Sequence, residues 1–160
     1  ALTALRSKEC IEARWEEIDF KKRIWAIPAE RMKMRREHII PLTDQMIRIF
    51  ELQKKEVNDP IYVFPSPQHK NQPMNPWSLS RSIHHAGYGG KHVLHGFRHL
   101  FSTTCYESNK WREDAIEMSL AHIISGVRGV YNKAKYLDER KDLMQWYNDL
   151  LIVYAKDLKI

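Results

Sequence analysis

The sequence predicts an α+β domain that is mainly α-helical, with a small three-stranded antiparallel sheet. Three short stretches rich in apolar and aromatic residues, at 18 to 20, 23 to 29 and 36 to 42, have the length and composition of strands. Around them, apolar residues recur at the three- and four-residue spacing of amphipathic helices. With 43% hydrophobic and 29% charged residues, the 160 residues suit a single domain, 1 to 160.

Start and stop signals place the first elements. Ser7 can cap a short helix that carries Ile11 and Trp15 on one side. The segment "ERMKMRRE", at 30 to 37, holds four cations between the second and third strands, which predicts a basic hairpin. Pro41 has no N–H to donate, so we expect it at the end or edge of the third strand.

Helices account for most of the remaining chain. Thr43 is expected to cap a helix whose apolar stripe includes Phe50. A proline-rich loop at 58 to 76 leads into a helix capped by Asn75, which glycines interrupt at 86 to 90. Further helices are expected at about 95 to 107, 112 to 121 and 138 to 155, the last with an apolar stripe of Leu143, Met144, Tyr147, Leu150, Leu151 and Tyr154.

The net charge of +6 and the isoelectric point near 9.3 indicate a polyanionic partner, either nucleic acid or anionic lipid. The apolar run "LLIVYA" is far shorter than the ~20 residues of a membrane span. Two widely separated thiols, Cys10 and Cys105, suit a reducing compartment, and we expect a cytoplasmic protein. The opening "ALTALR" has no Met and resembles the tail of a helix, so we expect a fragment of a longer protein.

One motif, "LHGFRHLFST" at 94 to 103, brings His95, Arg98 and His99 to the same face of a helix. Zinc is disfavoured, because Gly96 stands where a zinc-protease helix has its Glu and because a guanidinium beside the metal is repulsive. A phosphate clamp fits the arginine fork better. Without further context, an ordinary polar helix face is the leading interpretation.

The context is an ordered set of motifs. Arg6 comes first, followed by Lys33 in the basic hairpin, H-x-x-R at His95, L-x-H at His122, and Tyr131. This set resembles the catalytic domain of tyrosine recombinases, the phage integrase family. The prophage and genomic-island type is matched most closely, by "ARWEEID", "ERMKMRREHIIPL", "HGFRHLFST", "AIEMSLAH" and "YNKAKYLDERKDLMQWYNDLL".

The resemblance implies a phosphate site. Arg6 and Arg98 would clamp the non-bridging oxygens of the scissile phosphate and stabilise the charge of the transition state. His95 and His122 would hydrogen-bond the same phosphate, and His95 is a candidate to accept the proton of the nucleophile. Because the arginines can take the electrostatic part of a metal, no metal or other cofactor is expected.

The resemblance also implies the two groups that exchange at phosphorus. Tyr131 would attack and form a 3′-phosphotyrosine link, while Lys33 would protonate the leaving 5′-oxygen. Tyr136 and Tyr147 are competing nucleophiles by residue type, but Tyr147 lies in the expected apolar stripe. The short, apolar segment "IISGV" that precedes Tyr131 departs from the prophage and genomic-island pattern, and "LAH" stands where the wider family often has "LGH".

Further residues and partners follow from the resemblance. Glu9 and His99 would support the site, and Arg31, Arg35 and Arg36 would bind DNA. The partner would be double-stranded DNA at attachment sites in the bacterial nucleoid. The protein would be a tetramer on DNA and a monomer in solution, with N-terminal DNA-binding domains and an accessory directionality or DNA-bending protein. Two alternatives remain: a type IB topoisomerase, and a non-catalytic DNA-binding remnant of an integrase.

Overall fold

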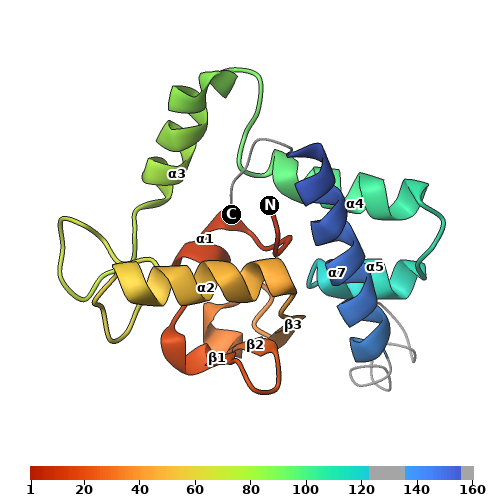
Figure 1. The fold of residues 1–160 in the computed structure, drawn as a ribbon, viewed down its shortest axis with the longest axis horizontal. Coiled ribbons are helices and arrows are strands. Elements are labelled where there is room, and N and C mark those ends of the chain that lie inside the picture. The colour runs from red at the N-terminus through yellow and green to blue at the C-terminus, as the bar shows by residue number, and fades with distance from the viewer. Residues whose placement is uncertain (123–135, 156–160) are drawn as a thin grey trace.

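A computed structural model describes residues 1–122 and 136–155 and has the predicted α+β architecture (Figure 1). Strands β1 (Ile18–Asp19), β2 (Ile24–Ile27) and β3 (His38–Pro41) form an antiparallel sheet in the order β1-β2-β3. Trp25 stands at its centre, opposite Ile18 on one side and Ile40 on the other.

The strands are shorter than the sequence suggests. The second does not extend from 23 to 29, because Arg23 has a φ of 55° and Pro28 has no N–H for the ladder. A 3₁₀ turn, η2 (Ala29–Arg31), follows at once and starts the basic hairpin. Pro41 ends β3, as predicted.

The first helix, α1 (Ser7–Ile11), begins one residue earlier than predicted. Its cap is Arg6, not Ser7: the Arg6 backbone is extended, and its N–H donates to Glu9 Oε2 at 3.1 Å. A carboxylate that returns to the cap N–H satisfies a donor that the helix leaves free. Trp15 lies outside α1, in the separate 3₁₀ turn η1 (Trp15–Glu17).

The next two caps are confirmed. Thr43 Oγ1 accepts from the N–H of Met46 at 3.3 Å and begins α2 (Asp44–Glu56). Asn75 caps α3 (Pro76–Ile83), and the π-type turn η3 (His84–Tyr88) ends this segment at Gly87, whose φ is 83°. The remaining described helices are α4 (Gly96–Glu107), α5 (Glu113–Ser119) and α7 (Leu137–Tyr154).

Helices α4, α5 and α7 gather on one side of the molecule, and the sheet lies with α1 and α2 on the other (Figure 1). Trp25 packs edge-on against Phe50 of α2, with 5.8 Å between ring centroids, and Phe101 of α4 packs against Tyr147 of α7 at 4.9 Å. Tyr147 is fully buried, as predicted, but Tyr154 is 80% exposed, so the buried stripe of α7 ends earlier than expected. Within the described residues, no helix has the length and apolarity to cross a membrane.

Candidate active site

Arg98, in the first turn of α4, is the centre of the site. Only 5% of its surface is exposed. Nη1 donates to the carbonyl of Ala4 at 2.7 Å, and Nη2 donates to the carbonyl of Leu120, at the end of α5. Nη2 also lies 2.9 Å from Nε2 of His122. The guanidinium is thus fixed by neutral groups from two distant segments, and further N–H donors are left for a ligand.

The charge of Arg98 is incompletely compensated. Burial, followed by the positive charge of Arg6, lowers the pKa of Arg98 to about 10, while Glu9 and Glu117 act in the opposite direction. A pKa of about 10 keeps the group charged at neutral pH. An anion bound between the two arginines would relieve their repulsion.

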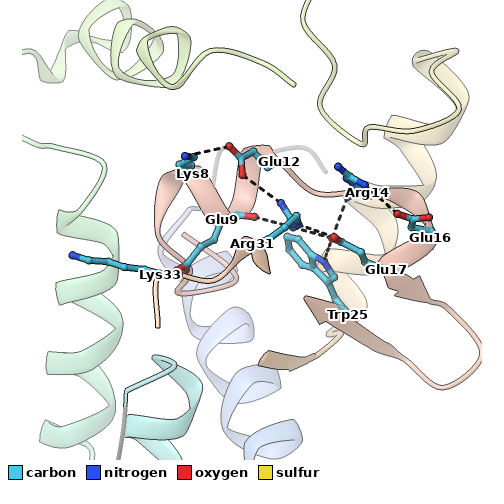
Figure 2. Close-up of polar contacts among 9 residues, drawn as sticks. All are labelled: Lys8, Glu9, Glu12, Arg14, Glu16, Glu17, Trp25, Arg31 and Lys33. Atoms are coloured by element: carbon cyan, nitrogen blue, oxygen red, sulfur yellow. Dashed lines mark hydrogen bonds and ion pairs between the residues drawn. The ribbon is translucent and has the colours of Figure 1, made fainter. Parts of the chain in front are cut away.

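Glu9 connects Arg6 to the basic hairpin. This carboxylate is 3% exposed and accepts from Nη1 and the backbone N–H of Arg6, both at 3.1 Å. The backbone N–H of Lys33 lies 3.5 Å from Oε1 of the same carboxylate. The Lys33 side chain is exposed and extends away from the carboxylates (Figure 2). Glu9 thus joins Arg6 to the hairpin, and its supporting role in the site stays a prediction.

A sharp turn after α5 presents His122. The N–H of His122 bonds to the carbonyl of Glu117 at 3.0 Å and that of Ala121 to Met118 at 3.1 Å, the pattern of a Schellman motif. Ala121 has a φ of 52°, a left-handed conformation that favours glycine. This turn explains why glycine often stands before the histidine in the wider family, and it means that alanine here carries some strain.

Glu117 is a site residue that the sequence reasoning missed. Its Oε2 lies 2.7 Å from Nδ1 of His122, and Tyr106 of α4 donates to its Oε1 at 3.0 Å. With Nδ1–H directed at the carboxylate, Nε2 faces Arg98 and the site. The available sequence signal was the five-residue spacing of Glu117 and His122 across an expected helix end. A Schellman turn there brings the two positions together.

His95 and His99 are both exposed at the start of α4, and their rings pack edge to face with centroids 4.9 Å apart. Desolvation, then the charges of His99, Arg98 and Arg6, lowers the pKa of His95 below its ordinary value. The neutral ring can accept a proton. His99 contacts His95, and the supporting role expected of it stays a prediction.

Comparison with known proteins identifies the family of this chain. The profile of the phage integrase family matches residues 1–137. The chain belongs to the phage integrase family. It is 43% identical over 151 residues to the prophage integrase IntA of Escherichia coli (strain K12), covering 94% of this chain and 36% of that protein.

Two phage proteins of the family give similar matches. The integrase of Shigella phage Sf6 is 41% identical over 93% of this chain and 39% of its own length, and that of Enterobacteria phage P4 is 36% identical over 94% and 38%. The chain thus spans less than half the length of these curated relatives. No solved structure gives a significant match.

Arg31 does not have the position expected of a DNA-binding residue. Its guanidinium pairs with the Glu17 carboxylate through Nε–Oε1 at 2.7 Å and Nη2–Oε2 at 2.8 Å, and its side chain is only 10% exposed. The geometry therefore gives no support to the predicted DNA contact. Arg35 and Arg36, also predicted to bind DNA, are exposed farther along the hairpin.

The predicted family nucleophile, Tyr131, lies outside the described residues. Its two competitors are engaged in the fold. Tyr147 is fully buried, and burial raises the pKa of its hydroxyl. Tyr136 is 8% exposed and donates to Asp114 Oδ2 at 3.0 Å. Among residues 1–122 and 136–155, no three His, Cys, Asp or Glu side chains are grouped as metal ligands would be.

Proposed function

We propose that residues 1 to 160 form the catalytic domain of a site-specific tyrosine recombinase, which integrates DNA by cutting and rejoining a duplex. The observation that carries the proposal is the pairing of Arg98 with His122 beside a second guanidinium, that of Arg6. Arg98 is held by carbonyls, which fix its direction and leave its charge available to a phosphate. The integrase names of the relatives support the same activity.

In the proposed cleavage, the Tyr131 oxygen attacks phosphorus and gives its proton to neutral His95. The negative charge that develops on the non-bridging oxygens is stabilised by Arg6 and Arg98. His122 lies beside Arg98 and is the next candidate to hydrogen-bond this phosphate, with Glu117 bonded to Nδ1 on the opposite side of its ring.

The P–O5′ bond breaks as the P–O bond to Tyr131 forms, and Lys33 gives its proton to the leaving oxygen. The 3′-phosphotyrosine link retains the energy of the phosphodiester, so a second 5′-hydroxyl can reverse the step without ATP. Attachment-site DNA is the proposed substrate. A tetramer on DNA, N-terminal DNA-binding domains and an accessory protein remain part of this proposal.

The test is a covalent adduct. The full-length protein is incubated with a nicked duplex taken from the junction that flanks its integrated element, and the products are run on a denaturing gel. We expect an adduct that Tyr131→Phe abolishes and that the matched Tyr147→Phe retains, because the Tyr147 hydroxyl is buried without a partner among the described residues.

Three results would contradict the proposal. An adduct that persists in Tyr131→Phe would exclude this nucleophile. No adduct from the intact protein would favour a non-catalytic DNA-binding remnant. Relaxation of supercoiled DNA that lacks an attachment site would favour a topoisomerase.

A further inference from the structure

A buried ion pair lies beneath the hairpin that carries Lys33, and the proposed reaction gives it no part. Figure 2 shows the Arg31 guanidinium between α1 and the Glu17 carboxylate, which Trp25 also contacts. The side chains of Arg31 and Glu17 are 10% and 4% exposed. Two parallel N–H···O bonds fix both the distance and the orientation of this pair.

Glu17 is itself fixed to the core. Its Oε2 accepts from the indole N–H of Trp25 at 3.0 Å and from the backbone N–H of Arg14 at 3.2 Å. Trp25 is fully buried at the centre of the sheet. The carboxylate that receives Arg31 is therefore one of the least movable groups in this half of the molecule.

Arg31 also contacts α1, the helix that carries Glu9. Its Nη2 lies 3.4 Å from the Glu9 carbonyl, and its Nη1 lies 3.9 Å from Glu12 Oε2. Lys33 is only two residues farther along the chain, and its N–H reaches the Glu9 carboxylate. Arg31 therefore fixes the hairpin to the same helix that orients Arg6.

The hairpin has few other supports. Residues 33 to 37 are all exposed, and besides Arg31 the supports at this end are buried Met32 and the contact of the Lys33 N–H with Glu9. An exposed lysine on an unanchored turn would sample many positions, and a misplacement of about 1 Å can cost about 100-fold in rate.

We propose that Arg31 is a positioning residue, which holds the Lys33 ammonium at the leaving 5′-oxygen through its buried pair with Glu17. The inference rests on the proposed function, in which Lys33 is the proton donor. It replaces the DNA contact predicted for Arg31 from the sequence.

A DNA substrate with sulfur in place of the bridging 5′-oxygen distinguishes loss of this positioning role from a general distortion of the site. As Tyr131 attacks, the electron pair of the breaking bond goes to the 5′-oxygen, which takes the Lys33 proton. If sulfur replaces that bridging oxygen, the leaving group departs as a thiolate, since thiols have a pKa near 8.5 and need no proton donor. A defect that acts through Lys33 should therefore disappear with sulfur.

The experiment compares single-turnover cleavage of the nicked duplex with bridging oxygen and with bridging 5′-sulfur, in the full-length protein. Arg31→Lys keeps the charge but loses the planar fork. We expect it to cleave the oxygen substrate roughly 10- to 100-fold more slowly and the sulfur substrate within about 3-fold of wild type, with unchanged DNA affinity. Glu17→Gln breaks the same pair from the other side and should behave alike.

Two controls interpret the result. Lys33→Ala should lose roughly 100-fold or more on oxygen and recover on sulfur. Arg36→Ala removes an exposed cation of the same hairpin, so it should weaken DNA binding and show no selective recovery on sulfur.

The outcomes separate the two proposals. In one outcome, the sulfur substrate restores the cleavage rate of Lys33→Ala but not that of Arg31→Lys and Glu17→Gln. That result would overturn the positioning role and leave Lys33 as the proton donor. Failure of Lys33→Ala to recover would overturn the proton-donor role, and the inference with it. Weaker DNA binding by Arg31→Lys, with equal loss on both substrates, would restore the DNA contact.

Discussion

His38 should make the stability of the fold depend on pH. It begins β3, is 6% exposed, and its Nε2 has no hydrogen-bond partner within the described residues. Burial lowers its pKa to about 3, and the charges of Arg140, Arg98 and Arg6 act in the same direction. An interaction with the Ser119 backbone opposes them.

The direction of the pH effect follows from the protonation of His38 in the folded and unfolded states. The folded protein holds His38 neutral, whereas the unfolded chain protonates it below a pKa of about 6.5. The contribution to stability is therefore complete above pH 6.5 and is lost as the pH falls toward 3. At pH 5, about 97% of unfolded chains carry the proton, which lowers the free energy of unfolding by about 2 kcal/mol.

Urea unfolding at pH 8 and at pH 5 measures this contribution. In His38→Gln, the loss of unfolding free energy between the two pH values should be about 2 kcal/mol smaller than in wild type. Comparing the two pH values within each protein removes the cost of repacking the site. His69→Gln, at an exposed histidine, should behave as wild type does.

The same pH loss in His38→Gln and in wild type would refute the reasoning. It would mean that the folded protein accommodates a protonated His38 beside its arginines.

Three further predictions concern a cap, a histidine pair and the hairpin. Thr43→Ala removes the acceptor of the Met46 N–H and of Asn148 Nδ2, so denaturant unfolding should show a loss of about 2 to 3 kcal/mol that Thr43→Ser largely restores. In an NMR titration, the pKa of His95 should lie below its ordinary value and should rise in His99→Gln, because a neighbouring positive charge is removed; an unchanged pKa would exclude that coupling. Arg36→Ala should reduce the slope of log K against log salt by about 0.9 per lost phosphate contact, and an identical slope would remove Arg36 from the interface.

The elements that the sequence predicts best are those with local causes. Thr43 and Asn75 cap their helices through bonds to residues two or three positions away, and Pro41 ends its strand because it has no N–H. The cap at Ser7 was wrong because Arg6 and Glu9 form a reciprocal pair, which a rule based on preferred cap residues does not include.

The motifs predict which residues belong to the site but not how they are held. The carbonyl of Ala4 lies 94 positions from Arg98 in the chain, and no pattern in the sequence indicates that contact. The inward direction of Arg31 has the same cause, since its partner Glu17 is fixed by Trp25 of strand β2. Only tertiary structure distinguishes Arg31 from its exposed neighbours.

Three arginines with little exposed surface differ in their partners, and the partners determine whether the charge is neutralised. Arg31 faces a carboxylate, so its charge is neutralised and the pair is structural. Arg140 donates to Ser119 Oγ at 3.2 Å and to the Ile39 carbonyl at 2.6 Å, which ties α7 to α5 and β3. Arg98 is also held by carbonyls, but it alone of the three has the second arginine and His122 beside it.

His38 lies close to the charges of Arg98 and Arg140, so its protonation state changes the total charge around the site. Arg140 and Arg98 both lower its pKa, and Arg98 is the residue proposed to hold the phosphate. A protonated His38 would add a third cation to a buried region whose arginines already have pKa values lowered to about 10. Burial and the neighbouring arginines thus hold His38 neutral, so that this region carries the two guanidinium charges without a third.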